Sequence, residues 1–350
     1  PPVDANMLQL SQGSHPAQQR LIFEELVAHQ VSLLSRRAYI QQIEAPRIST
    51  SRQFAKQLLS SLPFEMTNAQ KRVSKEIVQD LKLNKPMLRL VQGDVGAGKT
   101  LVAGVAACHV LEEGWQVALM APTEILAEQH YLNFKKWFEP LGLSVSWLSG
   151  KQKGKARAAA EQAIVDGTAH LVVGTHALFQ DNVRFAKLGL VIIDEQHRFG
   201  VDQRLALRNK GAQNMTPHQL VMTATPIPRT LAMSAYGDLD TSVIDELPPG
   251  RTPIQTVTIP LDRREEVLQR IASNCLEGKQ AYWVCTLVEE SETLDAQAAE
   301  ATYLEIKERF PELNIGLVHG KMKADEKQAV MQQFKANELQ LLIATTVIEV

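Results

Sequence analysis

The chain has 350 residues, of which 45% are hydrophobic and 22% are charged, and its formal net charge is −2. These values are typical of a globular protein with at least two domains, and they exclude a general electrostatic attraction to nucleic acid, so a polyanion would have to bind a local patch. The apolar stretch at residues 101–108 is far shorter than the roughly 18 residues that a membrane span needs, so no membrane association is expected.

The first 62 residues predict two helices and no chemistry. The chain begins Pro-Pro without a signal-like segment, which suggests a piece of a longer protein. Residues 17–42 carry apolar side chains such as Leu21 and Leu26 at helical spacing, and they predict one long amphipathic helix. Residues 52–61 predict a shorter helix that stops before Pro63. We therefore interpret residues 1–62 as a helical connector.

Residues 63–247 alternate apolar runs with helical patterns. Runs that are apolar at nearly every position, separated by helices, predict a parallel sheet covered on both faces, and hence an α/β domain. Ligands of such sheets bind outside the carboxyl ends of the strands. The predicted strands are residues 87–91, 116–121, 144–148, 170–174, 188–194 and 219–224.

A proline-rich stretch at residues 248–253 interrupts this alternation and predicts a domain boundary. The alternation then resumes and predicts a second parallel sheet, which is still incomplete where the pattern stops at residue 350. Its predicted strands are residues 254–259, 281–286, 315–318 and 340–345, and its predicted helices are residues 263–277, 296–310 and 324–334.

The strongest chemical signal is the sequence GDVGAGKT, which matches the phosphate-loop template G-x-x-x-x-G-K-[ST] between a predicted strand and a helix at residues 101–111. Small residues let backbone N–H groups curl around anionic oxygens, and the positive end of the helix points at them. Lys99 would reach the β- and γ-phosphates of ATP, and the Thr100 hydroxyl would ligate Mg²⁺. The alternative is a glycine-rich turn that ends in Lys-Thr by chance. The predicted nucleotide-binding residues of this loop are Gly93, Asp94, Val95, Gly96, Ala97, Gly98, Lys99 and Thr100.

A second signal is the buried strand that ends in Asp194 and Glu195. Asp194 is placed to hold Mg²⁺, usually through water, and Glu195 to orient and deprotonate the water that attacks the γ-phosphate. The alternative is an acidic strand end that caps the next helix. An upstream phosphate loop in the same α/β domain favours a hydrolysis site.

The sequence Asp-Glu-Gln-His at residues 194–197 resembles the DExH box of superfamily 2 helicases and translocases. The segments LPFEMTNAQKR, GDVGAGKT, VIIDEQHRFGV, MTATPIPRTLAMSAYGDLD, DELPPGRTP and YWVCTLVEESE are similar to those of RecG-type branched-DNA helicases. The resemblance covers about residues 62–350. It implies two RecA-like P-loop domains, with a first, ATP-binding lobe at 63–247 and a second lobe at 248–350 that is incomplete at its C-terminus.

The resemblance also implies roles for individual residues. Phe64, Thr67 and Gln70, in PFEMTNAQ, resemble the adenine-reading element, with Gln70 as the amide that pairs with the base. The stretch APTEILAEQH at residues 121–130 resembles the first DNA-contacting motif. Thr100 and Asp194 would hold Mg²⁺. The expected catalytic residues are Glu195, Lys99 and His197. The residues expected to couple ATP state to DNA grip are Thr223, Thr225 and Arg229.

DNA contacts are expected at strand ends and in one basic cluster. Thr123 can grip a phosphate or simply cap a helix, and both readings stay open. The basic cluster at residues 151–157 suits a solvated face or DNA, and the resemblance favours DNA. The predicted DNA-binding residues are Thr123, Lys151, Lys153, Lys155, Arg157, Thr175, His319, Lys321 and Thr345.

Other conspicuous side chains are interpreted as packing. His109 lies in an apolar helix and is expected to be a core histidine rather than a ligand. The tryptophans are expected to be packing residues, with stacking of one of them on a base as the alternative, and they are Trp115, Trp137, Trp147 and Trp283. Three cysteines without metal-ligand spacing predict buried, reduced thiols of a cytosolic protein, and they are Cys108, Cys275 and Cys285.

The expected function is the motor portion of an ATP-dependent DNA helicase that unwinds and branch-migrates forks and Holliday junctions in recombination and replication-fork repair. The resemblance implies a monomeric, bacterial, cytoplasmic and nucleoid-associated protein. The family's arginine-finger motif would follow residue 350, so this chain is expected to hydrolyse ATP poorly. The alternatives are a duplex-DNA translocase that remodels a protein complex, and a nucleotide-gated DNA-binding module without efficient catalysis.

Overall fold

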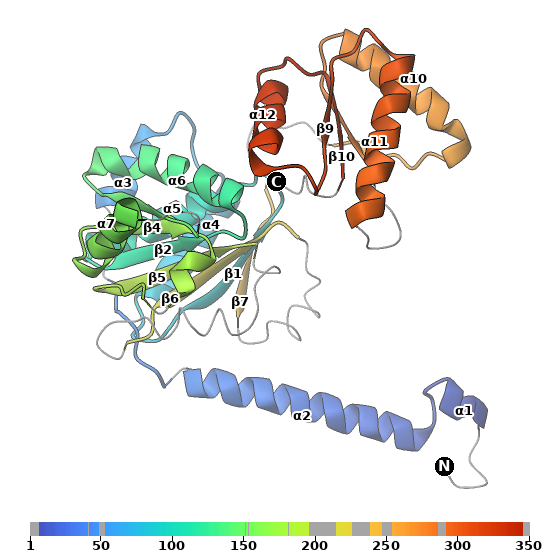
Figure 1. Cartoon of the computed structure of the whole chain (residues 1–350). Helices are drawn as coiled ribbons and strands as arrows, with labels where there is room; N and C mark the ends of the chain where they lie inside the picture. The colour runs from blue at the N-terminus through green and yellow to red at the C-terminus, as the bar shows by residue number, and fades with distance from the viewer. Residues whose placement is uncertain are drawn as a thin grey trace. The chain divides into compact units, whose positions relative to one another are not determined.

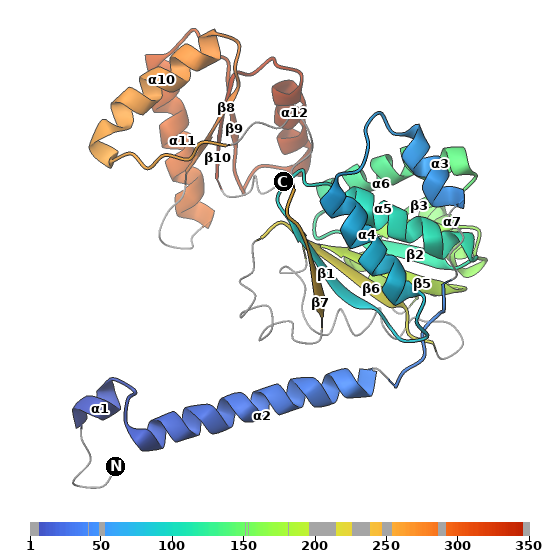
Figure 2. The same cartoon turned by 180° about the vertical axis from the view of Figure 1, so that it is seen from behind.

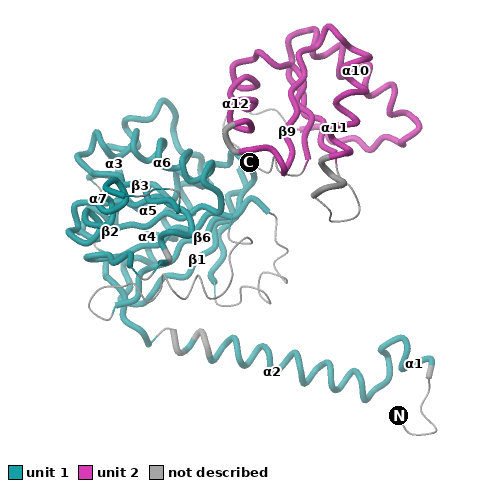
Figure 3. The backbone as a smooth tube through the Cα atoms, in the orientation of Figure 1, with its two compact units in different colours: residues 1–251 teal, residues 252–350 magenta. Residues whose placement is uncertain are grey.

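The computed structural model describes residues 7–40, 42–48, 53–150, 152, 154–180, 182–195, 215–225, 239–246, 254–285 and 292–345. The chain divides into two compact units, residues 1–251 and 252–350, coloured separately in Figure 3. Each unit is built on a parallel β-sheet. Among the described residues, no helix is both long enough and apolar enough to cross a membrane.

The first unit contains a seven-stranded sheet in the order β3-β4-β2-β5-β6-β1-β7, whose strands are labelled in Figures 1 and 2 together. Every neighbouring pair of strands is parallel. The strands are β1 (Leu88–Gly93), β2 (Gln116–Met120), β3 (Val145–Leu148), β4 (Leu171–Gly174), β5 (Leu188–Asp194), β6 (His218–Thr223) and β7 (Asp240–Ile244). Because all strands run the same way, their carboxyl ends lie along one edge of the sheet.

Alternate residues of each central strand point to opposite faces, and both faces are covered. One core contains side chains of α3 (Gln53–Ser61), α4 (Asn68–Leu81), α5 (Lys99–Glu112) and α6 (Glu124–Phe138), whose positions Figures 1 and 2 show from two sides. The other core contains Ile164 of α7 (Gly154–Val165) together with Leu178. The expected two-sided coverage is therefore confirmed.

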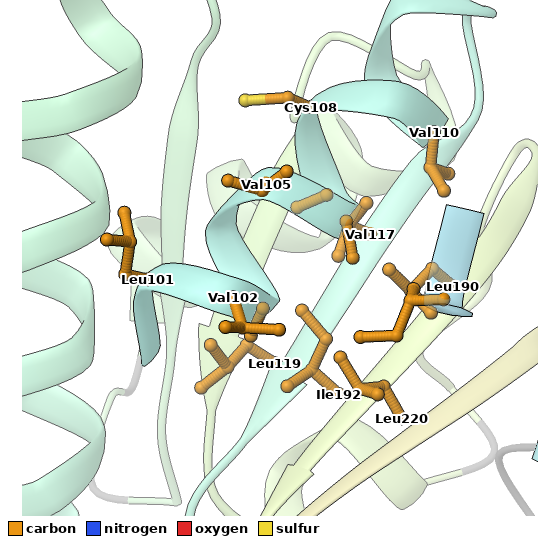
Figure 4. Close-up of a cluster of buried hydrophobic side chains, with 14 of the residues drawn as sticks. Leu101, Val102, Val105, Cys108, Val110, Val117, Leu119, Leu190, Ile192 and Leu220 are labelled. Carbon is orange, nitrogen blue, oxygen red and sulfur yellow. The ribbon is translucent and has the colours of Figure 1, made fainter. Parts of the chain in front are cut away.

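Helix α5 explains how the phosphate loop is held. Its buried side chain Val102 lies beside Leu119 of β2 and Ile192 of β5 (Figure 4). Leu101 and Val105, on the side of α5 away from these strands, belong to the same apolar core. These aliphatic residues lose their contact with water on folding, which favours the buried helix by about 1.5–3 kcal/mol per large side chain. The helix that begins at the loop is thus anchored along its length.

The second unit contains the three-stranded parallel sheet β8-β10-β9. One core packs α10 (Arg264–Leu276) and α11 (Glu292–Arg309) against this sheet, and a smaller cluster on the other strand faces includes Phe334 of α12 (Ala324–Lys335). The strands are β8 (Ala281–Val284), β9 (Ile315–Val318) and β10 (Leu341–Ala344).

Two expectations about elements were wrong. Residues 254–259 form no strand and are exposed. Five of these six residues are β-branched, a composition that favours a strand only where a neighbouring strand and a core are available. Conversely, β7 was not predicted, because Asp240–Ile244 is a mostly polar edge strand with only Ser242 and Ile244 buried.

The long N-terminal helix α2 (Pro16–Ile40) is present, after the short helix α1 (Met7–Ser11), but it is not amphipathic in the expected sense. No described side chain of α2 is buried. The consecutive residues Leu21, Ile22 and Phe23 are 65%, 51% and 67% exposed. Successive residues of a helix lie about 100° apart, so these three spread over more than half of the circumference rather than along one stripe.

Packing roles assigned to other side chains agree with the structure. His109 is 4% exposed, and the four tryptophans contact the cores as partly buried side chains. Cys108 and Cys275 are buried free thiols, and Cys285 is a partly buried one. Burial raises the pKa of Cys108 to about 12, which keeps this thiol protonated.

Candidate nucleotide site

The phosphate loop joins the end of β1 to the start of α5. Its residues Gly96 and Gly98 have positive φ angles of 79° and 84°, in the left-handed region that favours glycine. A Cβ atom on Gly98 would lie 2.3 Å from Nε2 of Gln70. Among the described residues no side chain caps the N-terminus of α5. Glycine at position 98 therefore lets the Gln70 side chain lie against the loop, next to a helix start without a side-chain cap.

Lys99 lies across this loop. Its Nζ donates hydrogen bonds to the backbone oxygens of Gly93, at 2.7 Å, and Asp94, at 3.1 Å. Burial lowers the pKa of Lys99, and the negative charges of Asp194 and Glu195 oppose this shift. The ammonium group thus lies within the electrostatic range of both carboxylates of the DExH box. Among the described residues its hydrogen bonds are to backbone oxygens, which an anionic ligand could replace.

Gln70 connects the predicted adenine-reading segment to the loop. Its Nε2 donates to the backbone oxygen of Ala97 at 2.8 Å. Its Oε1 accepts from the backbone N–H of Thr67, whose hydroxyl in turn accepts from the N–H of Gln70, so the two residues form a capping box at the start of α4. Both ends of the amide are therefore engaged within the protein. Phe64 remains 54% exposed beside this segment.

The two carboxylates lie at the end of β5, where Asp194 is the last residue of the strand and Glu195 follows it. Asp194 pairs with Met222 of the neighbouring strand β6. Glu195 has a φ of 49°, and its backbone N–H donates to the oxygen of Met222 and to Oδ1 of Asp194. Its own carboxylate accepts from the N–H of Ala224 at 3.1 Å and from the hydroxyl of Thr223 at 3.4 Å.

This arrangement brings together two sets of residues that the sequence analysis kept separate. Thr223 belongs to the predicted coupling motif and contacts the predicted catalytic Glu195 directly. The N–H of Thr225 donates to the Thr223 hydroxyl at 3.2 Å. His197 and Arg229 lie outside the described residues.

One site residue was not predicted. His130 of α6 donates from Nε2 to Oδ2 of Asp194 at 2.6 Å, and both side chains are largely buried. Its Nδ1 has no hydrogen-bond partner among the residues that the structure describes. The sequence contained a signal, because His130 is the last residue of the motif-like stretch at 121–130, but no spacing rule relates it to Asp194.

The predicted DNA contacts of the first unit occupy varied positions. Thr123 is the N-cap of α6, and its hydroxyl accepts from the N–H of Leu126, as the plain capping reading requires. Thr175 is buried after β4, and Lys155 is exposed on α7. Arg157 forms an ion pair with Glu161. Lys151 and Lys153 lie outside the described part of the chain.

In the second unit, the predicted contacts follow the strands. His319 comes after β9 and lies 3.4 Å from Glu300, while Lys321 is exposed two residues later. Thr345 is buried directly after β10, and its N–H donates to the oxygen of Val318. These residues lie at the carboxyl edge of their own sheet.

The residues of the first unit fit a magnesium nucleotide. The glycine-bounded helix start and the lysine suit phosphate oxygens. Within the described residues, no group of three or more His, Cys, Asp or Glu side chains could hold a metal alone. The Thr100 hydroxyl and the Asp194 carboxylate are oxygen donors, and Mg²⁺ is usually held by one or two protein oxygens together with water and substrate phosphates.

Family models and curated relatives both indicate that this chain is similar to DNA helicases. The model of the DEAD/DEAH box helicase family matches residues 67–234, and that of the helicase conserved C-terminal domain matches residues 263–350. The ATP-dependent DNA helicase RecG of Escherichia coli is 62% identical over 352 residues, which cover 100% of this chain and 51% of that protein. RecG of Haemophilus influenzae is 60% identical with the same coverage. The chain thus spans about half the length of these curated relatives.

Solved structures agree. A structure of RecG bound to a three-way DNA junction is 40% identical, with a TM-score of 0.78, and the match covers 95% of this chain and 43% of that one. Dbp5 of S. cerevisiae, solved with RNA and ADP BeF3, is 14% identical with a TM-score of 0.61 over 85% of this chain and 74% of that one, which shows the fold alone. The two parallel sheets have the RecA-like fold of helicase domains, as expected.

Proposed function

The chain belongs to the RecG family of DEAD/DEAH box helicases, and from this premise we propose that it provides the ATP-driven motor of an enzyme that unwinds and branch-migrates forks and Holliday junctions. The observation that carries the proposal is the convergence of the phosphate loop, Asp194 and Glu195 at one edge of the first sheet. A relative bound to a three-way DNA junction supports branched DNA as the substrate.

ATP and Mg²⁺ are the proposed cofactors. The backbone of residues 93–100 would bind the phosphates, and Lys99 would exchange the oxygens of Gly93 and Asp94 for the β- and γ-phosphates. Thr100 and Asp194 would hold Mg²⁺, which when bound neutralises charge on the phosphate oxygens. Phe64 would stack on the adenine. Reading of the base by Gln70 requires its Nε2 to share or release the oxygen of Ala97.

Glu195 is the proposed base that takes a proton from the attacking water. Its carboxylate already accepts hydrogen bonds from Ala224 and Thr223, which lie directly after and at the end of β6. A change in hydrogen bonding at Glu195 during hydrolysis would therefore be felt by residues 223–225. This contact supports the proposed coupling role of Thr223, Thr225 and Arg229, with His197 as a further catalytic residue.

The proposed division of labour follows the two units. Residues 63–247 would form the ATP-binding lobe and residues 248–350 the second lobe, after a helical connector at 1–62. DNA would be gripped mainly through its phosphates, without base reading, because hydroxyls and lysines at strand ends suit sequence-independent contact. The proposed contacts are Thr123, Lys151, Lys153, Lys155, Arg157, Thr175, His319, Lys321 and Thr345.

A Lys99→Ala substitution tests the assignment of the loop. Nucleotide affinity and ATP turnover are measured without DNA, with duplex DNA and with a model fork. We expect the variant to lose nucleotide affinity, together with whatever turnover the parent chain shows, because the ammonium group that binds the β- and γ-phosphates is removed. Lys75→Ala, an exposed lysine on α4, serves as the matched control and should behave as the parent chain does. Retained turnover in the Lys99 variant would overturn the assignment.

The same measurement separates the alternatives. Greater stimulation by fork than by duplex DNA supports the branched-DNA motor. Equal stimulation by both supports a duplex translocase that remodels protein complexes. Nucleotide-dependent DNA affinity without turnover supports a nucleotide-gated binding module.

A further inference from the structure

The contact between His130 and Asp194 joins two elements that are 64 residues apart in the chain. Nε2 of His130 lies 2.6 Å from Oδ2 of Asp194, and the side chains are only 8% and 13% exposed. Because a carboxylate can only accept, the histidine donates through Nε2. A hydrogen bond this short and this well shielded from water holds its two partners in one relative orientation.

Asp194 is held at both oxygens. Oδ1 accepts from the backbone N–H of Glu195 at 3.1 Å, while Oδ2 accepts from His130. These two contacts determine the rotation of the carboxylate about its Cβ–Cγ bond, and the remaining lone pairs keep their directions. A carboxylate that binds a metal or its water ligands depends on such outer hydrogen bonds for its orientation.

Helix α6 connects His130 with Thr123, the proposed DNA contact at the start of the helix. Thr123 caps the helix, and His130 lies seven residues further on, about 10 Å along the axis. Phe134, one turn beyond, is fully buried, and its ring lies 6.4 Å from that of His130. The ring of the histidine is thus packed against its own helix, so a displacement of α6 would move the carboxylate that it binds.

We propose that His130 is a positioning residue for Asp194, which sets the orientation of the metal-binding carboxylate and links it mechanically to the helix that begins at the proposed DNA contact. The proposal rests on the function proposed above, in which Asp194 holds Mg²⁺. It adds a connection between the nucleotide site and the proposed DNA contact Thr123. This connection is separate from the contact of Glu195 with the proposed coupling residue Thr223.

The competing explanation is that the pair only stabilises the fold. A purely structural pair would lower the stability of the variant but leave its response to Mg²⁺ unchanged once the protein is folded. A positioning residue would weaken the response to Mg²⁺ and leave nucleotide affinity without Mg²⁺ largely intact. The Mg²⁺ concentration at which nucleotide affinity is half-maximally increased therefore distinguishes the two explanations.

The test compares His130→Ala and His130→Gln with the parent chain. Binding of a fluorescent ATP analogue is titrated at a series of Mg²⁺ concentrations, without DNA and without turnover. In the alanine variant we expect the Mg²⁺ midpoint to rise by about tenfold or more, the range found when outer-shell partners of metal ligands are removed. Glutamine can place an N–H donor near the position of Nε2, so His130→Gln should recover most of this loss.

Phe134→Leu is the matched control, because it weakens the packing of the same helix without removing the hydrogen bond. Its midpoint should stay within about twofold of the parent value. An unchanged midpoint in His130→Ala, or an equal rise in Phe134→Leu, would overturn the proposal. If the parent chain binds no nucleotide at all, the proposed function fails instead, so the two failures are distinguishable.

Discussion

His218 shows how a single buried side chain ties distant backbone together. Its ring is fully buried at the start of β6. Nδ1 accepts from the N–H of Met87, at 3.0 Å, and Nε2 lies 2.7 Å from the oxygen of Pro46, to which it donates. Burial lowers the pKa of His218 from 6.5 to about 4. The neutral ring with its proton on Nε2 is the form that satisfies both partners.

This burial predicts a pH dependence of stability. Between pH 6.5 and about pH 4, the unfolded chain binds a proton at this position and the folded chain does not. The contribution of His218 to the free energy of unfolding should therefore be fully present above pH 6.5. It should be lost as the pH falls toward 4, which lowers the free energy of unfolding by up to about 3 kcal/mol. Urea unfolding of the parent chain and of His218→Gln, at several pH values, measures it. Parallel pH curves for the two proteins would contradict the prediction.

At the residue scale, the spacing of residues along the sequence was enough to predict most of the candidate nucleotide site. The glycines and Lys99 of the loop follow from one contiguous motif, and Asp194 with Glu195 from the end of one strand. His130 could not be predicted in this way, because its contact with Asp194 depends on how α6 is rotated over the sheet. The engagement of Gln70 by the oxygen of Ala97 is likewise a tertiary contact, across 27 residues.

At the scale of elements, the N-terminus of α4 is held from three sides. The N–H of Ala69 donates to Glu246, which follows β7, and the N–H of Gln70 donates to the hydroxyl of Thr67. Arg72 donates to the oxygen of Val243 and to the carboxylate of Asp245. The start of this helix is therefore hydrogen-bonded both to its own cap residue and to residues 243–246, at and after the end of β7.

Removal of the cap hydroxyl should weaken this helix start. We expect Thr67→Ala to lower the free energy of unfolding by about 1 kcal/mol, because the N–H of Gln70 loses its acceptor. Thr67→Ser keeps the hydroxyl and should lose much less. Chemical denaturation measures both variants, and an equal loss in the two would show that the methyl group rather than the cap matters.

Strands with buried apolar runs were predicted well, and the mostly polar edge strand β7 was missed. The central strands β2, β5 and β6 bury nearly every residue, so their composition alone distinguishes them. The edge strand β7 is mostly polar because it pairs on one side only, with β1. Residues 254–259 have the β-branched composition of a strand but remain exposed, since composition does not specify a partner strand.

At the scale of the whole chain, the two units have separate interiors. The cores of the first unit contain no described residue beyond Ile244, and those of the second begin at Leu268. The phosphate loop and both carboxylates of the DExH box belong to the first unit. Nucleotide binding at this site should therefore stabilise one unit selectively.

Calorimetry with and without a magnesium nucleotide tests this expectation. At a free ligand concentration about 100 times the Kd, the first unit should gain about 2.7 kcal/mol and unfold at a higher temperature. The transition of the second unit should stay in place, and Lys99→Ala should remove the shift. A single transition, or an equal shift of both, would show that the units do not unfold independently.

Because Glu195 has a left-handed backbone conformation, stability and catalysis favour different residues at this position. A φ of 49° is a conformation that glycine and asparagine adopt readily and glutamate rarely does. A saturation library at position 195 sorted only for folded, soluble protein should therefore tolerate or enrich those two residues. The same library sorted for ATP turnover should return glutamate alone. Evolution at this position would then record a trade-off in which selection for catalysis, rather than for stability, retains the residue.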